Sequence, residues 1–516
     1  MTASPDWDSA APFNMAGYCI AWAAAEAPEK AALIVIDDAQ SCHANETWTY
    51  ARLEDAVLHM AAALQDRGYR KGDRILIRLD NTSLYPITYL AAIAAGLIAL
   101  PASSQLTAAE VEFLLADSGA RVIALADGLR RGQIPAGTDV ISEHELRALI
   151  AHPRRADYAA TQRDDPAYLI YTSGTTARPK GVLHAHRVAL GRQPMYQGWY
   201  GISKSDRMLH AGAFNWTYTL GTGLIDPWAN GATAIIYTGE KTPDIWPGLI
   251  SKTGATIFAA VPSLMRQILK YAPAGPLDLG QLRHALIAGE RPPEDLFDTW
   301  LARTGMHLYE ALGMSELSTY ISTSPSVPRK PGTTGKPQPG RRVAILPLDG
   351  GTEPLPAGSE GLIAVHRSDP GLMLRYWNRP EEDLEVSRAD WFTGGDIGMM
   401  DVDGYITHLG RANDIMNAFG YRVAPQDVEA ALAHYPGIAE VACAEINVRR
   451  DVSIIAAFVV AAPGTNLNTE KIKAFASERL AAYKCPREVY IVDSLPRTAN
   501  GKIMRSALQA PRTGTG

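Results

Sequence analysis

The spacing of hydrophobic positions predicts that helices and strands alternate along most of the chain. Continuous apolar runs predict buried strands, and apolar residues three or four positions apart predict helices. In the first third, the predicted order is helix 15–30, strand 32–36, helix 53–64, strand 74–79, an Ala-rich helix ending near residue 97, helix 109–115 and strand 120–125. Residues 130–155 show no clear period and predict a connecting loop. Such alternation favours α/β layers around a largely parallel sheet.

The remaining two thirds predict a second α/β unit, a β-rich part and a small α+β unit. Apolar runs at 167–170, 233–237, 256–261 and 284–288 predict strands, and turn-rich residues 330–340 precede two more at 343–346 and 362–365. From Gly410 onward, short apolar runs at 423–432, 441–444, 453–460 and 472–480 fit a domain of about a hundred residues. We therefore predict a large N-terminal domain, 1–410, and a small C-terminal domain, 411–516, with the hinge at 411–414.

Composition limits the classes of protein that the chain can represent. With 516 residues, 47% of them hydrophobic, it can fill more than one core. A net charge of −6 gives no basic surface for nucleic acid. The four cysteines lie far apart, which argues against a disulfide framework or a zinc site. The acidic N-terminus does not match a signal peptide, and no apolar run can span a bilayer, so we predict a cytoplasmic protein.

One hydroxyl-rich and glycine-rich run predicts an anion site. The run Tyr171–Gly181 follows a predicted strand and contains no carboxylate. Its hydroxyls could donate to phosphate oxygens, Gly174 lets the backbone approach, and two cations add positive charge. The residues concerned are Thr172, Ser173, Gly174, Thr175, Thr176, Arg178 and Lys180. The run is not the common P-loop, and the alternative is an ordinary surface loop.

This run resembles the phosphate-binding signature of the adenylate-forming superfamily, which comprises acyl-CoA synthetases, luciferases and adenylation domains. Ala177 stands where the family usually has glycine. Within the superfamily, the chain looks most similar to the medium-chain and benzoate-type acid:CoA ligases. The resemblance implies an α/β protein with a large N-terminal domain and a small mobile α+β C-terminal domain.

A second motif, Gly313-Met314-Ser315-Glu316, resembles the family's Gly-x-Thr-Glu motif. The resemblance implies that Glu316 holds Mg²⁺, a cation that prefers carboxylate and phosphate oxygens, and that Ser315 bonds the α-phosphate. Leu312 stands where many relatives have the tyrosine that flanks adenine. Taken alone, the motif is most often a helix start with serine as the N-cap.

Two further groups of residues resemble nucleotide-binding motifs of the family. Gly289 and Glu290 follow a predicted strand, at the end where open α/β sheets bind ligands, and resemble a pair before the adenine site. Asp396 resembles the aspartate that accepts hydrogen bonds from both ribose hydroxyls, and Arg411 would reach a ribose oxygen or phosphate. The alternative is that these residues lie in ordinary solvated turns.

The C-terminal part carries two more matches. Gly420 resembles the glycine that lets the pantetheine of coenzyme A approach, and Lys502 resembles the lysine that stabilises charge during adenylation. Asn413 stands where the family's hinge residue is usually Asp or Lys. The resemblance implies that the small domain rotates between two half-reactions.

Together these motifs predict an ATP-dependent carboxylic acid:CoA ligase that uses Mg²⁺ and forms an acyl-adenylate before the thioester. By resemblance, the acyl pocket is lined by Phe214, Asn215, Trp216, Tyr218 and Gly221. These residues carry no charge, which favours an aromatic, alicyclic or medium-chain monocarboxylate, unless the aromatics are simply core. The alternatives are an adenylation enzyme that loads a carrier-protein thiol, a luciferase-like oxygenase, and a non-catalytic nucleotide sensor.

Overall fold

The computed structural model describes residues 11–129, 132–172, 179–412, 414, 416–418, 421–449, 452–497 and 503–509, and the structural statements below concern these residues. They form two compact units. The first contains the described residues up to 172 together with 179–342 and 366–390, and the second contains 343–365 and those from 391 onward. The boundary at 410/411 stays a prediction for the functional domains. No helix in the described part is both long and apolar enough to cross a membrane.

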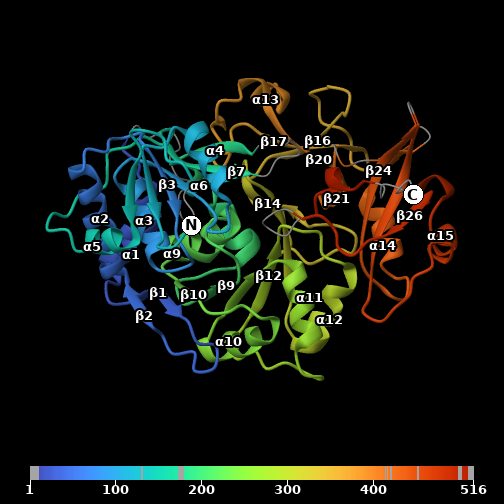
Figure 1. Ribbon diagram of the computed structural model, residues 1–516, viewed down its shortest axis with the longest axis horizontal. Coiled ribbons are helices and arrows are strands. Elements are labelled where there is room, and N and C mark those ends of the chain that lie inside the picture. The colour runs from blue at the N-terminus through green and yellow to red at the C-terminus, as the bar shows by residue number, and fades with distance from the viewer. Residues whose placement is uncertain are drawn as a thin grey trace. The chain divides into compact units, whose positions relative to one another are not determined.

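The first sheet of unit 1 has seven strands in the order β18-β8-β7-β4-β3-β5-β6. Figure 1 labels two of them, β7 and β3. Strands β3 to β7 pair in parallel, whereas β8 runs antiparallel to both β7 and β18. The strands are Arg74–Arg78 (β3), Ile98–Pro101 (β4), Val122–Leu125 (β5), Asp139–Ser142 (β6), Pro166–Thr172 (β7), Lys180–Ala185 (β8) and Arg375–Tyr376 (β18).

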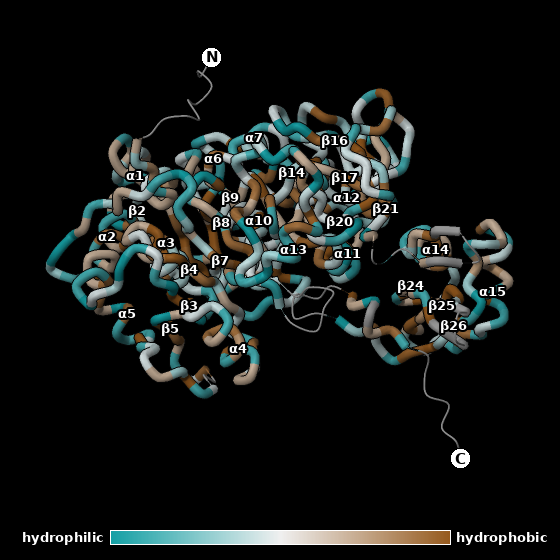
Figure 2. Tube along the Cα trace, turned by 90° about the horizontal axis from the view of Figure 1, so that it is seen from above, coloured by the Kyte–Doolittle hydropathy of each residue, from teal (hydrophilic) through white to brown (hydrophobic). Residues whose placement is uncertain are grey.

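The second sheet of unit 1 has nine strands in the order β15-β14-β13-β12-β11-β9-β10-β1-β2. Its centre, from β13 to β1, is parallel, and β2, β14 and β15 join antiparallel at the edges. The strands are Ala31–Ile36 (β1), Glu46–Thr49 (β2), Arg207–His210 (β9), Thr233–Tyr237 (β10), Ile257–Ala260 (β11), His284–Ala288 (β12), Leu308–Met314 (β13), Ser318–Ser322 (β14) and Lys336–Pro337 (β15). Hydrophobic residues lie along strands such as β8 and β9 (Figure 2).

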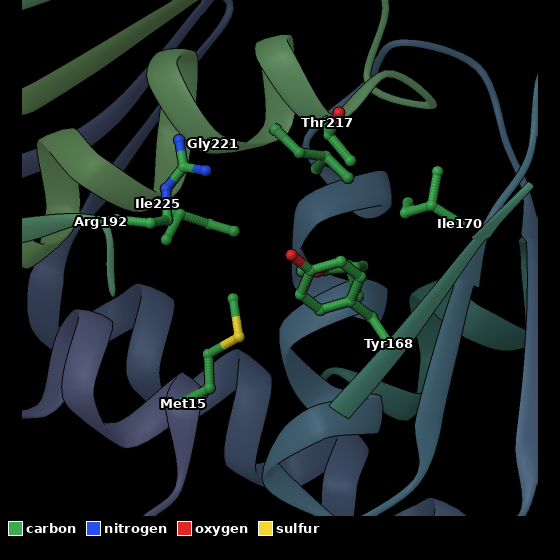
Figure 3. A pocket seen from close by; sticks show the side chains of 9 residues that line it. Met15, Tyr168, Ile170, Arg192, Thr217, Gly221 and Ile225 are labelled. Carbon is green, nitrogen blue, oxygen red and sulfur yellow. The ribbon is translucent and has the colours of Figure 1, made fainter. Parts of the chain in front are cut away.

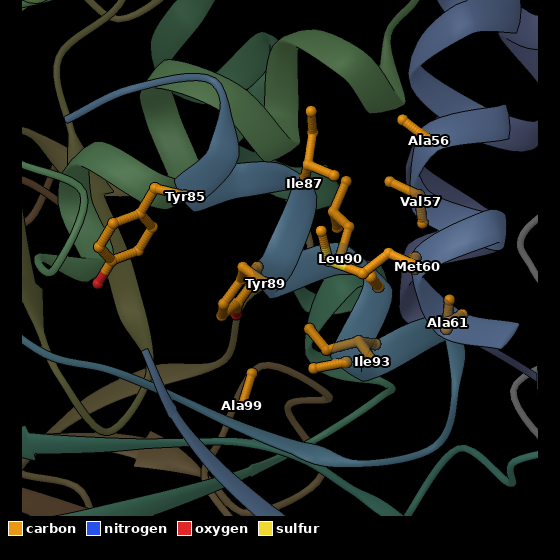
Figure 4. Close-up of a cluster of buried hydrophobic side chains, with 14 of the residues drawn as sticks. Ala56, Val57, Met60, Ala61, Tyr85, Ile87, Tyr89, Leu90, Ile93 and Ala99 are labelled. Atoms are coloured by element: carbon orange, nitrogen blue, oxygen red, sulfur yellow. The ribbon is translucent and has the colours of Figure 1, made fainter. Parts of the chain in front are cut away.

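The helices of unit 1 bury apolar faces against these sheets. In Figure 4, Val57 and Met60 of α2 point toward Leu90 and Ile93 of α3. Thr49 caps α2 by accepting a hydrogen bond from the backbone N–H of Arg52. The helices are Met15–Glu26 (α1), Tyr50–Asp66 (α2), Leu84–Ala94 (α3), Ala108–Ser118 (α4), Glu143–Leu149 (α5), Val188–Gly191 (α6), Gln193–Met195 (α7), Thr217–Leu220 (α8), Asp226–Ala229 (α9), Trp246–Thr253 (α10), Pro262–Tyr271 (α11), Glu294–Thr304 (α12) and Pro380–Glu385 (α13), with π-helical turns Tyr196–Tyr200 (η1) and Gly221–Ile225 (η2).

The sequence missed one strand, and one local prediction was wrong. The Ala-rich helix ends at Ala94, close to the predicted end near residue 97, but strand β4 was not predicted, because a short apolar run fits either a helix or a buried strand and pairing with β3 decides it. The predicted loop 130–155 contains β6 and α5. Helix α5 begins with a capping box between Ser142 and Glu145, a signal that was visible in the sequence.

Unit 2 contains the predicted β-rich part and the α+β part. Strand β17 pairs antiparallel with β16, and β20 with β21. In the α+β part, β24, β25 and β26 form a sheet that shares a core with α14 and α15. The elements are Val343–Leu346 (β16), Glu360–His366 (β17), Trp391–Met400 (β20), Ile406–Arg411 (β21), Met416–Ala418 (β22), Tyr421–Val423 (β23), Pro425–Leu432 (α14), Ile438–Arg449 (β24), Val452–Ala461 (β25), Thr469–Ser477 (α15) and Glu488–Ile491 (β26).

A buried ion pair ties three elements of unit 1 together. The Arg192 guanidinium donates to both oxygens of Asp226, at 2.7 and 2.6 Å, and to Ser318 Oγ at 2.7 Å. Tyr200 Oη also donates to Asp226. Gly221 allows this arrangement, because a Cβ there would lie 2.0 Å from an Arg192 nitrogen. A buried pair of this kind stabilises only while every partner stays in place.

We predict that Gly221→Ala destabilises the protein by about 3 kcal/mol, because the methyl group would displace a guanidinium that Asp226 and Ser318 hold. Gly248→Ala in α10 is the matched control. A Cβ at Gly248 meets nothing within 4 Å, so we expect no loss, or a gain of up to about 1 kcal/mol. Urea unfolding measures both, and equal stability of the two variants would contradict the prediction.

Candidate functional site

The described ends of the predicted phosphate-binding run belong to two paired strands. Thr172 ends β7 and Lys180 begins β8, and these two residues pair directly in the antiparallel ladder. The predicted binding residues Ser173, Gly174, Thr175 and Thr176 lie outside the described residues, as do Ala177 and Arg178. The register of the ladder therefore fixes both ends of the loop.

Lys180 lies among acidic and aromatic side chains. Its ammonium forms an ion pair with Glu382 of α13 and lies 5.6 Å from the centre of the Tyr376 ring. Tyr376 belongs to β18, and Glu382 lies in the helix that follows it. The cation is therefore held at the start of β8 and is only partly exposed to solvent.

Ser315 and Glu316 lie in the turn that joins β13 to β14, so the alternative of a helix start is wrong. The turn is tight: Ser318 has φ of +86°, and a Cβ at Gly313 would lie 2.8 Å from the Ser318 carbonyl oxygen. Arg192 bonds the Ser318 hydroxyl and so supports this unusual backbone. The motif needs glycine at position 313 for close approach of the backbone.

His184 of β8 contacts the turn from one side. Its Nε2 lies 2.8 Å from the Ser315 carbonyl oxygen, and burial lowers the pKa of His184 to about 4. A neutral ring that meets a carbonyl must carry its proton on Nε2, which leaves Nδ1 as an acceptor. The imidazole also stacks on Tyr168, with ring centres 4.7 Å apart.

Glu316 is contacted by the segment around β18. Tyr376 Oη donates to Glu316 Oε1 at 2.8 Å, and the Met373 N–H donates to the Glu316 carbonyl oxygen at 2.8 Å. Lys180 and Glu316, which belong to two different predicted motifs, thus share Tyr376 as a neighbour. The structure brings these two motifs together.

Gly289 and Glu290 follow β12 at its carboxyl end, as predicted. Gly289 has φ of +93°, and a Cβ there would lie 3.1 Å from the Trp216 ring. Trp216 in turn meets Tyr218 edge to face at 5.8 Å. The Glu290 carboxylate accepts hydrogen bonds from the backbone and hydroxyl of Ser263. An aromatic wall therefore lies against the Gly289 backbone.

The other residues predicted to line the acyl pocket lie in different surroundings. Phe214 is buried in the main core and packs on Tyr85, with ring centres 5.7 Å apart, whereas Asn215 is half-buried. Gly221 lines a small pocket. Figure 3 shows Arg192, Tyr168 and Thr217 around this pocket, which Met15, Tyr89, Ile170, Leu220 and Ile225 also line.

The strand that leads into the Ser315–Glu316 turn carries a carboxyl group that the sequence did not single out. Burial raises the pKa of Glu310 in β13 to about 8, and Arg291 opposes this shift. Leu312, two residues further on, is half-buried and pairs with Ile321 of β14. The aliphatic side chain predicted as an adenine wall thus lies on the same strand as Glu310.

The predicted ribose site lies in unit 2. Asp396 of β20 is 3% exposed, and its Oδ1 lies 3.2 Å from Arg411 Nε and 3.0 Å from His408 Nε2. Arg411 also donates to the Gly394 carbonyl oxygen at 2.7 Å. The β20–β21 ladder brings Asp396 and Arg411 opposite one another. Asn413, Gly420 and Lys502 lie outside the described residues.

Comparison with known families identifies both parts of the chain. Residues 20–377 match the model of the AMP-binding enzyme, and residues 427–502 match the AMP-binding enzyme C-terminal domain. The chain belongs to the AMP-binding enzyme family. The predicted resemblance is therefore confirmed.

Individual members of the family are similar over nearly the whole chain. A benzoate–CoA ligase of Thauera aromatica is 31% identical, covering 92% of each chain. The crystal structure of a benzoate CoA ligase from Burkholderia xenovorans LB400 has a TM-score of 0.84 at 28% identity, covering 96% of this chain and 99% of the other. An o-succinylbenzoate coenzyme A synthetase from Bacillus subtilis, solved with ATP and magnesium ion, has a TM-score of 0.83 at 26% identity, covering 95% and 99%.

This AMP-binding enzyme is an AMP-forming acid–thiol ligase, as predicted, and its substrates beside the acid are ATP and coenzyme A, with Mg²⁺. The roles of individual residues stay predictions. Sequence reasoning missed Tyr376, His184, Glu310 and His408. No local pattern marks them, because each acquires its contact from a segment distant in sequence or from the pairing of strands.

We predict that Glu310 makes the AMP-binding enzyme less stable as pH rises from about 5 to about 8. A carboxyl whose pKa is raised in the folded state binds a proton that the unfolded chain has already released, so folding becomes less favourable toward higher pH. Glu310→Gln removes this dependence. Relative to wild type, the variant should gain roughly 4 kcal/mol of stability between pH 5 and pH 8. Thermal melts at pH 5, 6.5 and 8 test this, and parallel curves would contradict it.

Proposed function

We propose that this ligase activates an aromatic monocarboxylic acid and transfers the acyl group to coenzyme A. The observation that supports the proposal is the Trp216 ring against Gly289, backed by Tyr218, near the carboxyl end of β12, where α/β sheets bind ligands. Tyr218 Oη bonds the carbonyl oxygens of Ala260 and Leu286, so its ring is fixed. The half-buried indole of Trp216 offers a flat apolar surface suited to an aromatic ring.

The first half-reaction forms the acyl-adenylate. The substrate carboxylate attacks the α-phosphorus of ATP, the bond to the bridging oxygen breaks, and pyrophosphate leaves. We assign Lys180, Thr172 and the hydroxyls of 173–176 to the phosphates, Ser315 to the α-phosphate, and Lys502 to the charge that develops in the transition state. These groups act by position and charge, because none of them exchanges a proton with the substrate.

The Mg²⁺ that the family uses fits Glu316. This side chain supplies one carboxylate, half-buried, with Tyr376 on one oxygen. Within the described residues there is no cluster of three or more His, Cys, Asp or Glu that could hold a metal, which agrees with a cation bound by one carboxylate and by phosphate oxygens. When bound, the ion neutralises the charge on the phosphates.

The nucleotide base and ribose are assigned to separate groups of residues. Gly289, Glu290 and Leu312 would border the adenine, and Asp396 would accept the ribose hydroxyls, with Arg411 and His408 holding its carboxylate. In the second half-reaction the thiol of coenzyme A attacks the acyl carbonyl and AMP leaves; we assign the approach of pantetheine to Gly420. The hinge at 411–414 and a cytoplasmic location remain proposals from the sequence.

The test is AMP release with benzoate, cyclohexanecarboxylate and straight-chain acids of two to ten carbons, each with and without coenzyme A. We expect the highest kcat/KM with benzoate-type acids and turnover that depends on coenzyme A. Turnover with straight-chain acids alone would contradict the proposed acid. Release of AMP that ignores coenzyme A would instead indicate a carrier-protein thiol as acceptor.

We predict that Trp216→Ala raises KM for the aromatic acid by about 10- to 100-fold, because the ring would lose a contact face worth roughly 1–3 kcal/mol. KM for ATP should change less than threefold. Trp22→Ala, on the exposed side of α1, serves as the control and should leave both values unchanged. An equal rise in both KM values would show that Trp216 supports the whole site and does not contact the acid.

A further inference from the structure

We propose that Tyr376 is a positioning residue that orients the Glu316 carboxylate for the divalent cation of the nucleotide. The inference rests on the proposed role of Glu316 in metal binding. It adds a residue that neither the motifs nor the predicted site contain. Tyr376 would act through Glu316 and need not touch substrate itself.

The contacts hold Glu316 at two points. Tyr376 Oη donates to Oε1 at 2.8 Å, while the Met373 N–H donates to the backbone carbonyl oxygen at 2.8 Å. A carboxylate has two oxygens and several lone pairs, so one hydrogen bond at Oε1 leaves Oε2 available as a metal ligand. Fixing the side chain in advance removes the rotational freedom that it would otherwise lose when the cation binds.

Tyr376 is itself held firmly. It is 6% exposed, its backbone N–H donates to Asp383 Oδ1 at 2.8 Å, and it pairs with Val182 of β8. The next residue, Trp377, donates its N–H to the Gly181 carbonyl oxygen at 2.7 Å. Backbone hydrogen bonds at Tyr376 and at the next residue therefore hold the segment that carries the hydroxyl.

The same ring lies beside Lys180. The Lys180 ammonium is 5.6 Å from its centre and forms an ion pair with Glu382 of α13. One side chain thus borders the cation assigned to the phosphates and the carboxylate assigned to the metal. Tyr376→Phe keeps the ring beside Lys180 and removes only the donor to Glu316, which makes it a clean variant.

The test measures metal binding directly, without turnover. Mn²⁺ is titrated into the full-length protein with the non-hydrolysable analogue α,β-methylene-ATP, and free Mn²⁺ is read by electron paramagnetic resonance. We expect Tyr376→Phe to raise the Kd of Mn²⁺ about 5- to 10-fold. Tyr50→Phe removes another buried hydroxyl, which donates to the Ala232 carbonyl oxygen at 2.6 Å in another part of the unit, and should leave the Kd unchanged.

A double-mutant cycle separates positioning from general damage to the fold. If Tyr376 acts through Glu316, Tyr376→Phe should change the Kd less than twofold in a Glu316→Gln background. Glu316→Asp, which shortens the side chain without touching β18, should raise the Kd as Tyr376→Phe does. This second variant keeps the proposal open to test should Tyr376→Phe melt early.

Three results would overturn the proposal, and they are distinguishable. Additive effects in the cycle would show that Tyr376 acts independently of Glu316. An unchanged Kd in Tyr376→Phe, with a weakened Kd in Glu316→Gln, would refute positioning and leave the proposed metal role intact. An unchanged Kd in both would refute the metal role and, with it, the positioning.

Discussion

The backbone hydrogen-bond ladder of β8 is the constraint on which the candidate site depends. This strand pairs with β7 on one side and β18 on the other. Its first residue is Lys180, and its fifth is His184, which meets the Ser315 carbonyl oxygen. A slip of one residue in this register would turn every side chain to the opposite face and separate these contacts. The ladder therefore holds two distant motifs in one place.

The free-energy cost of removing charges from water explains the state of the buried polar side chains near the ladder. The Arg192–Asp226 ion pair is buried, and two neighbours add hydrogen bonds to it: Ser318 Oγ accepts one from Arg192, and Tyr200 Oη donates one to Asp226. His184 avoids the same cost by staying neutral, as its lowered pKa indicates. Buried charges are thus paired, whereas the buried imidazole serves as a neutral donor. The glycine at 221 is part of this arrangement, because it leaves room for the guanidinium.

The groups assigned to catalysis are held by other parts of the chain more than by their own motifs. Glu316 takes its orientation from Tyr376, and Asp396 is contacted by His408 and Arg411 across the β20–β21 ladder. Reactions that proceed by positioning and electrostatic stabilisation require such support, because the donors must already point at the developing charge. Tyr218, which packs on Trp216, is held in the same way, because its hydroxyl lies within hydrogen-bond distance of the carbonyl oxygens of Ala260 in β11 and Leu286 in β12.

The sequence by itself determined the family, the order of the motifs and most strands, because these depend on residue types at fixed local spacing and on continuous apolar runs. It also located Gly289–Glu290 at a strand end. It did not reveal that residues 98–101 form β4, since pairing with β3 settles that. Nor could it show that Phe214 lies in the core, or that Tyr376 and His184 meet Glu316 and Ser315. Those contacts join segments 60 and 131 residues apart, and only the packing of the sheet brings them within hydrogen-bond distance.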